Sequence, residues 1–488
     1  MTDFELEASR RLPLADAALR LLDHVTETEF LTGVFKRHRG RSYTDTIAFP
    51  SFVHLLSEAL IGHRRSAHQA FVHAKKEASL KATVQAMYGK LRRVPLSLSL
   101  GFFAEAAARL REAAATTVVN ALPASLDSFW VLGFDGKKIK YVAKRLKPLR
   151  GLKGDIYGGK LLVVQDLATR QAVAANADPD GEAADSPLVP AAVEQVRALG
   201  GTRARLWVGD RAFCQFQLLG LLAAGDDHYV VRFNTSCGFH VDSQVPARTG
   251  TDDEGRPYRE EWGWLGKPDN PHRTRVRRIT VTRPGDPLIF VTSLEDADRF
   301  PAKDLLTLYR SRWGVEVMFQ QVVQTFDLRH LIGTTPQGTV FQAMFALLLY
   351  NIAMMVRDYV AEGAERKPND VSLILLFDEI VRDLTAWLKF IPTDATLEII
   401  RATAIRSAEE LRRYLQESLA KVWKDSWKKS PKRKRSPPTP PHAYICGGHT
   451  SVDKVLRGAH QEIPLKPEKP KAKKTGDPPP PYETKKHV

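Results

Sequence analysis

The order of secondary structure after residue 128 constrains the fold most strongly. Short apolar runs bounded by turn residues predict strands at 129–136, 160–166, 171–177, 205–210 and 228–233. Helical spacing predicts helices at 186–199 and 213–225. The first strands are therefore joined by a hairpin and the later ones by helices, which indicates a mixed α/β sheet rather than a uniformly parallel one.

The rest of the chain divides by composition. We expect a helical domain over 1–120, a β-rich insertion over 234–300 with strands near 277–283 and 287–293, and further helices over 361–425. The catalytic core would then consist of 121–233 and 301–360, and the Pro- and Lys-rich segment 426–488 should be a disordered tail. The apolar run that begins at Ala343 is interrupted by Asn351, so we interpret it as a buried helix rather than a membrane span.

The net charge and the cysteine content limit the classes of partner and site that this chain can have. The 488 residues carry a formal net charge of +16, which favours a polyanionic partner such as double-stranded DNA over an anionic membrane surface. The three cysteines are far apart and form no CxxC pair, so neither a disulfide framework nor a zinc module is supported. No signal peptide is evident at the N-terminus, and we expect a cytoplasmic protein.

Basic segments are candidate DNA-binding surfaces. Helical segments 35–41 and 64–93 mix Lys and Arg with apolar positions, and 137–154, which begins with Lys137 and Lys138, is dense in basic residues. The alternative for each is a solvated basic face, and the tail has the same two interpretations, a grip on nucleic acid or an aid to solubility.

Three acids stand out because of where they fall. Asp135 and Asp210 each lie at the end of a predicted buried strand, and Glu316 lies on a predicted helix beside Tyr309 and Arg312. Each has a simple structural alternative: a turn at Asp135, a helix cap at Asp210, and an i,i+4 ion pair between Arg312 and Glu316. If the two strands are adjacent, however, the three carboxylates converge.

Converging carboxylates repel one another and therefore favour bound cations. Two unit charges about 4 Å apart repel by roughly 4 kcal/mol at an effective dielectric constant of about 20. Mg²⁺ prefers oxygen ligands and leaves positions open for a phosphodiester, so we expect two Mg²⁺ ions, with Mn²⁺ able to substitute.

The blocks around these acids, FDG at Asp135, GDRAF at Asp210 and YRSRWGVEVMF at Glu316, resemble those of DDE transposases with an RNase H-like core. The most similar group is the insertion-sequence-four family with its Tyr-Arg-Glu-Lys signature. Separations of 75 residues between the aspartates and 106 from Asp210 to Glu316 suit a core with a β-rich insertion. The resemblance covers about 125–360.

This resemblance implies a function. Asp135, Asp210 and Glu316 would be the catalytic metal ligands of a cut-and-paste transposase, and Tyr309 and Arg312 would contact the DNA at the transposon end. An insertion-domain aromatic would stack on a flipped base, for which Trp262 and Trp264 are candidates, although both could be core residues of the insertion. Pairing two inverted-repeat ends implies at least a homodimer on DNA, in the bacterial nucleoid.

One position departs from the family signature. Val323 stands where the signature has lysine, and Gln320 stands where a basic residue is frequent. Two alternatives to an active transposase therefore remain: a decayed or repurposed DNA-binding protein, and an RNase H-like nuclease without strand transfer.

Overall fold

The fold is described from a computed structural model of the chain. It describes residue 7 and the ranges 9–42, 47–61, 67–76, 82–115, 122–140, 147–152, 154, 156–325, 334–391, 405–429 and 450–458. Parts of the predicted basic segments 64–93 and 137–154, and most of the predicted tail, lie outside these residues.

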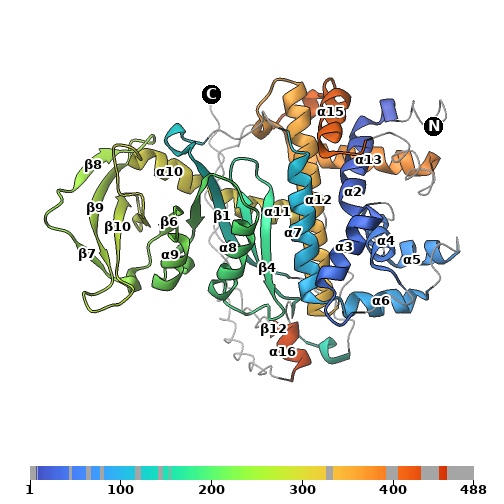
Figure 1. Ribbon diagram of the computed structural model, residues 1–488, viewed down its shortest axis with the longest axis horizontal. Helices are drawn as coiled ribbons and strands as arrows, with labels where there is room; N and C mark the ends of the chain where they lie inside the picture. Colours follow the sequence, from blue (N-terminus) through green and yellow to red (C-terminus); the bar gives the residue numbers. More distant parts are fainter. Residues whose placement is uncertain are drawn as a thin grey trace, which may run out of the picture.

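One mixed sheet organises the described residues (Figure 1). Its ten strands are β1 (Phe129–Lys138), β3 (Lys160–Asp166), β4 (Ala172–Asp178), β5 (Ala204–Gly209), β6 (His228–Arg232), β7 (Phe239–Val241), β8 (Arg248–Thr251), β9 (Pro257–Leu265), β10 (Thr274–Val281) and β11 (Leu288–Thr292). They lie in the order β4-β3-β1-β5-β6-β11-β10-β9-β7, with β8 paired to β9.

The pairing confirms the mixed sheet. Strand β1 runs parallel to β5, and β5 runs parallel to β6, whereas β3 pairs antiparallel with both β1 and β4. The predicted hairpin is therefore β3-β4, and the strands that end near Asp135 and Asp210 are neighbours. Strand β1 continues past its predicted end to Lys138 because Lys137 and Lys138 pair with the first residues of β3.

The predicted β-rich insertion extends the same sheet. Strand β11 pairs antiparallel with β6, and β10, β9 and β7 follow outward by antiparallel pairing. Figure 1 shows this extension at one end of the molecule, away from the helical end.

Helices cover both faces of the sheet, as the alternation of its apolar residues requires. Leu132, Trp207 and Tyr229 pack with α8 (Val189–Ala198) and α9 (Phe216–Leu222) on one face. Val131 and Val208 face the other core, together with α10 (Ala302–Ser311), α11 (Trp313–Thr325) and α12 (Pro336–Gly363).

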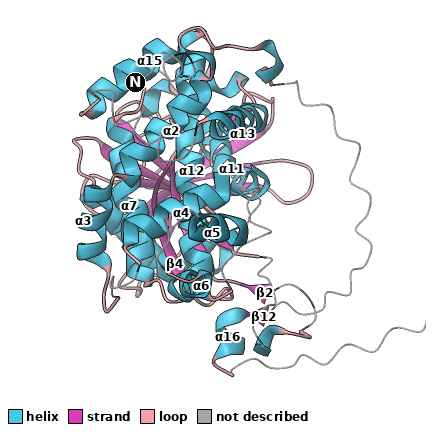
Figure 2. Cartoon of the chain, turned by 90° about the vertical axis from the view of Figure 1, so that its right-hand side faces the viewer, coloured by secondary structure: helices cyan, strands magenta, loops and turns pink. Residues whose placement is uncertain are grey.

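The N-terminal helices join that second core (Figure 2). They are α2 (Pro13–Thr26), α3 (Thr28–His38), α4 (Phe49–Ile61), α5 (Ala67–Lys76), α6 (Val84–Arg92) and α7 (Leu96–Glu112). Phe102 of α7 stacks on Phe341 and Phe345 of α12. Two later helices, α13 (Leu373–Phe390) and α15 (Ala408–Leu419), complete the bundle. The helical segment 1–120 thus shares its core with α12, and its assignment as a DNA-binding domain stays a prediction.

Helix α12 is the predicted buried helix, and it is longer than the apolar run. Among the described helices it alone has the length and hydropathy to cross a membrane, yet its most apolar window is 100% buried inside the protein.

Two parts of the predicted tail are folded. Trp427 is buried in η8 (Asp425–Trp427), and β12 (Thr450–Ser451) pairs with β2 (Ile156–Tyr157) and leads into α16 (Val452–Leu456). The prediction of a disordered tail is therefore wrong for these residues, because their few apolar side chains find partners far away in the sequence. Residues 430–449 and 459–488 lie outside the described residues.

Asn351 explains the polar interruption in α12. Its side chain is buried, accepts a hydrogen bond from Ala172 N (2.9 Å) and donates one to Ala172 O (2.8 Å). The helix thereby satisfies both backbone groups of Ala172 on the edge strand β4.

We predict that Asn351→Leu lowers the free energy of unfolding by about 2–4 kcal/mol, because two buried backbone groups of Ala172 lose their partner. Met355→Leu, a buried change on the same helix without a polar group, should cost less than about 1.5 kcal/mol. Urea unfolding measures both variants. Equal losses would show that the two hydrogen bonds do not stabilise the fold.

Candidate active site

Asp135 and Asp210 lie side by side because β1 and β5 are parallel neighbours. Gly133 pairs with Val208, and continuing this register by two residues brings Asp135 beside Asp210. Adjacent strands are about 4.8 Å apart. Side chains two residues apart along a strand point to the same face of the sheet. Asp135 therefore shares a face with Val131, and Asp210 shares it with Val208, which is the face covered by α11.

Helix α11 brings Glu316 to this pair. A methyl group at Gly133 would come within 3.1 Å of Val315, so the absence of a side chain there lets α11 pack closely on β1. Glu316 follows Val315 and lines the same cleft as Asp135. The structure thus brings the three predicted acids to one region, Glu316 from the helix and the two aspartates from the sheet.

The helix that carries Glu316 differs from the prediction. The one helix expected to carry Tyr309, Arg312 and Glu316 is broken at Arg312, which separates α10 from α11. Arg170 donates a hydrogen bond from Nη1 to Ser311 O (2.8 Å), and the Ser311 hydroxyl donates to Leu308 O (2.6 Å). These contacts satisfy the end of α10 and stabilise the break.

Arg312 lies at this break, between the acids. Its Nη2 donates to Glu316 Oε1 (3.0 Å), and its Nη1 is 3.9 Å from Asp135 Oδ2. The predicted i,i+4 ion pair therefore exists, but it is part of a larger arrangement. Burial would lower the pKa of Arg312, yet the nearby Tyr309, Asp135, Glu316 and Asp210 raise it overall.

The electrostatics of Asp135 reflect this crowding. Burial raises the pKa of Asp135 to about 6, Arg312 and the Gly136 N–H oppose the rise, and Glu316 and Asp185 add to it. Asp135 Oδ1 accepts from Gly136 N (2.9 Å). Since Asp135 lies within β1, it is not part of a turn.

Asp210 has an oxygen without a partner. Its side chain makes no cap hydrogen bond to η4 (Arg211–Phe213), and Oδ1 is buried and accepts no hydrogen bond. Its charge contributes to the raised pKa of Tyr309, whose main cause is burial. Asp210 therefore does not cap η4 with its side chain.

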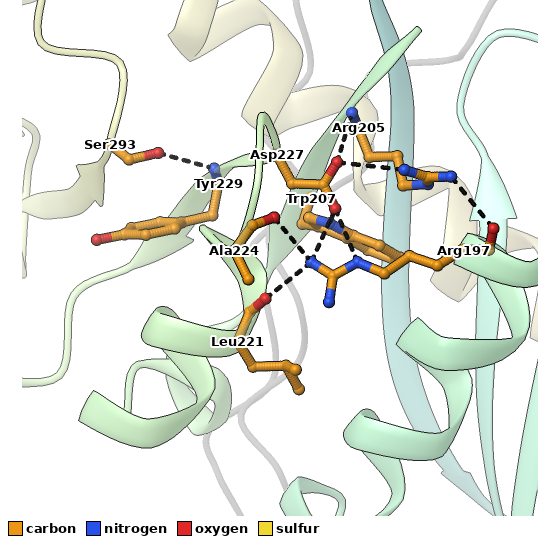
Figure 3. Close-up of polar contacts among 8 residues, drawn as sticks. All are labelled: Arg197, Arg205, Trp207, Leu221, Ala224, Asp227, Tyr229 and Ser293. Atoms are coloured by element: carbon orange, nitrogen blue, oxygen red, sulfur yellow. Dashed lines mark hydrogen bonds and ion pairs between the residues drawn. The ribbon is translucent and has the colours of Figure 1, made fainter. Parts of the chain in front are cut away.

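Asp227 provides a contrast at the opposite ends of the same strands (Figure 3). Its Oδ2 accepts from Arg197 Nε (3.1 Å) and Trp207 Nε1 (3.3 Å), and its Oδ1 accepts from Arg205 N (3.0 Å). A buried acid with a complete set of donors is a structural element. Asp210 has no such set.

An open cleft lies next to the acids. It encloses about 500 Å³ and includes Asp135, Glu316, the apolar side chains of Phe319 and Val322, and the exposed ring of Trp313. Its basic residues are Lys137, Lys138 and Lys140. Val323 and Gln320 also line it, so the departure from the family signature falls inside the cleft.

The other predicted DNA contacts are less accessible. Tyr309 and Arg312 are 8% and 7% exposed, and Tyr309 stacks on Phe290 of β11. Trp262 is buried and donates from Nε1 to Glu295 O (2.9 Å). Trp264 is half-buried beneath Arg273, whose guanidinium lies 4.5 Å from the ring centroid. Base stacking by either tryptophan stays a prediction, and the burial of Trp262 matches the core alternative.

The carboxylates suit a divalent metal by chemistry but do not form a closed site. All three candidates offer oxygen, and Asp210 Oδ1 has no other partner. Within the described residues, however, no three His, Cys, Asp or Glu side chains are grouped to hold one ion. Arg312 donates to Glu316 Oε1, so an ion that bound this oxygen would compete with the guanidinium for it.

Comparison with known proteins agrees with this geometry. The family model described as "Transposase DDE domain" matches residues 134–352, from the end of β1 into α12. This segment is similar to the DDE domain of transposases. Its matched region contains Asp135, Asp210 and Glu316 and the whole sheet extension between the last two.

Two transposase relatives are similar to parts of this chain, and one of them belongs to the insertion sequence element IS4. "Transposase InsG for insertion sequence element IS4" of Escherichia coli (strain K12) is 32% identical over 23% of this chain. "Putative transposase y4zB" of Sinorhizobium fredii (strain NBRC 101917 / NGR234) is 26% identical over 30% of the chain. The matches span 25% and 42% of the relatives' own lengths.

A solved structure of a piggyBac transposase synaptic complex with hairpin DNA also matches. It is 13% identical, with a TM-score of 0.34 over 85% of this chain and 76% of that chain.

The sequence did not point to two residues that lie near Asp135. Asp185 contributes to the raised pKa of Asp135 from the loop between β4 and α8, and Lys160 lies 2.7 Å from Asp185. The sequence feature that could have pointed to Asp185 is the acid-rich stretch DPDGEAAD (178–185), which follows a predicted strand.

We predict that ionisation of Asp135 lowers the free energy of unfolding as the pH rises from about 4 to about 7. Its carboxyl group releases its proton near pH 4 in the unfolded chain but near pH 6 in the native protein, so the native state binds more protons between these values. Asp135→Asn should therefore gain stability relative to wild type, on the order of 2 kcal/mol, between pH 4 and pH 7.

Thermal unfolding in EDTA, repeated across this pH range, measures the difference. Asp226→Asn, an exposed acid, is the matched control and should follow the wild-type profile. Parallel profiles for wild type and Asp135→Asn would contradict the assigned pKa.

Proposed function

We propose that the protein is a transposase that cuts an insertion sequence out of DNA and joins it to a target. The observation that carries this proposal is the alignment of Asp135 and Asp210 on adjacent parallel strands, facing the helix that bears Glu316. The match of residues 134–352 to the transposase DDE domain model supports it.

Asp135, Asp210 and Glu316 would hold two divalent ions, Mg²⁺ with Mn²⁺ as a substitute. When bound, such ions supply charge stabilisation for the attacking and leaving oxygens of a phosphodiester. The protein holds the acids close together and half-buried, and it offsets their repulsion with the Arg312 guanidinium. Release of Glu316 by Arg312 would free a carboxylate oxygen and leave the guanidinium available for phosphate.

The cleft would receive the DNA end. Lys137, Lys138 and Lys140 offer contacts for backbone phosphates next to Asp135. Trp313 is 60% exposed and presents an aromatic face on which a base can stack, for about 1–3 kcal/mol. The formal charge of +16 supports double-stranded DNA as the partner, both inverted-repeat ends and target.

The reaction would follow two steps without a covalent enzyme intermediate. Water would first attack the phosphodiester at the element's end, and the freed 3′-hydroxyl would then attack the target DNA. Both are in-line displacements at phosphorus, so one arrangement of carboxylates serves both. Two ends must meet for insertion, so we infer a homodimer on DNA.

We predict that Glu316→Gln retains binding to a duplex with the inverted repeat that flanks the gene, but slows Mg²⁺-dependent cleavage about 10²-fold or more. The amide keeps the side chain's shape and loses the charge. Glu194→Gln, an exposed change on α8 across the sheet, is the matched control and should cleave normally. Undiminished cleavage by Glu316→Gln would remove this residue from the site.

A second candidate function is DNA binding without catalysis. Val323 favours it, because this cleft position lacks the lysine of the family signature. Binding of the duplex by wild type with no nicking in Mg²⁺ or Mn²⁺ would support this function. Cleavage without a joined product would indicate a nuclease instead.

We predict that Val323→Lys adds one phosphate contact. The slope of log affinity against log salt concentration should steepen by about 0.9, and cleavage should increase if the missing lysine limits activity. Val323→Leu is the control for side-chain size. Equal salt slopes in the two variants would show that DNA does not reach this part of the cleft.

A further inference from the structure

The loop between β4 and α8 lies against the end of β1. The carboxylate of Asp185 is so close to Gly136 that a methyl group at Gly136 would overlap it. Lys160, whose side chain is 8% exposed, holds Asp185 with an Nζ–Oδ1 distance of 2.7 Å. Asp185 is therefore fixed between β3 and the residue that follows Asp135.

Helix capping does not account for Asp185. It stands at the N-cap of η3 (Ser186–Leu188), but its side chain makes no cap hydrogen bond. Its charge also adds to the repulsion around Asp135 rather than relieving it. The ion pair with the buried Lys160 and the contact with Gly136, rather than a helix end, therefore hold this acid in place.

The C-terminal segment holds the same loop from the other side. Ser451 is fully buried, its Oγ accepts from Gly181 N (3.0 Å), and its N donates to Glu182 Oε1 (3.2 Å). Val452 is also fully buried and packs with Leu149 and Ile156. Figure 2 shows β12 and α16 beside β2.

We propose that Asp185 is a positioning residue for Asp135, and that the docked segment 450–452 keeps it in place. Ser451 hydrogen-bonds Gly181 and Glu182, which lie three to four residues before Asp185 in the same loop, and Asp185 lies against Gly136. Asp185 packs on the β1 backbone at Gly136 and thereby limits the directions in which the Asp135 carboxylate can point. This inference rests on the proposed function, because it concerns how the same acids are held.

Cleavage by the full-length protein tests the catalytic part. Asp185→Ala should slow single-turnover cleavage of the inverted-repeat duplex about 10–100-fold, as loss of a group that orients a metal ligand does, with affinity for the duplex unchanged within about twofold. Gly136→Ala, which displaces Asp185 without a change of charge, should show the same loss. Asp226→Ala, an exposed acid, should behave as wild type.

Wild-type rates in both Asp185→Ala and Gly136→Ala would overturn the proposal. A parallel loss of DNA affinity and rate would also overturn it, since that result indicates general disruption of the cleft rather than positioning.

Hydrogen exchange tests the structural part without DNA or metal. Val452→Asp should undock the segment and speed amide exchange roughly tenfold in peptides covering 134–138 and 178–188. Arg457→Ala is the control, because this side chain is 70% exposed and pairs with Asp453 within the same segment. Unchanged exchange over 134–138 in Val452→Asp would overturn the coupling. If the wild-type protein cleaves no DNA, the proposed function fails. The exchange measurement still shows whether docking of segment 450–452 restrains residues 134–138.

Discussion

The arrangement of the candidate site depends on one guanidinium. Arg312 donates to Glu316 and lies 3.9 Å from Asp135, with Asp210 near enough to influence its pKa. Without this cation, the negative charges that converge on it would be uncompensated and would raise one another's pKa. The fold places Arg312 there by ending α10 one residue earlier, and Arg170 stabilises that end from the sheet side. The break in the helix is thus part of the site.

Two acids near opposite ends of β5 differ in how their carboxylate oxygens are satisfied. Asp227 satisfies its oxygens with two arginines, a tryptophan and a backbone N–H. Asp210, at the other end of β5, leaves a buried oxygen without a partner. An unsatisfied buried oxygen costs stability, so its retention where two strands and a helix meet supports a ligand role.

The sequence predicted the parts of the site that depend on local pattern. Apolar runs located the strands, and the acids at or near their ends followed directly, so Asp135 and Asp210 were expected to converge if their two strands were adjacent. Glu316 was placed on a helix, and the hairpin of β3 and β4 was also predicted. All of these rest on side-chain periodicity and on the rules of strand connection.

Contacts between distant residues could not be predicted in this way. The break at Arg312 depends on Arg170, 142 positions earlier in the chain, and the position of Asp185 depends on Lys160 and on Ser451. The same limit explains why Trp262 was a candidate for stacking on a base. In the structure its ring is buried, and its Nε1 donates a hydrogen bond to Glu295 O. Nothing in the local sequence distinguishes a tryptophan on the outer face of a strand from one packed against a neighbouring arginine.

Anomalous diffraction from crystals soaked in Mn²⁺ tests the central claim most directly. The account predicts manganese peaks bounded by the carboxylates of Asp135, Asp210 and Glu316, with the Arg312 guanidinium turned away from Glu316. Manganese bound elsewhere, with Arg312 still paired to Glu316 and Asp210 without a ligand, would contradict it.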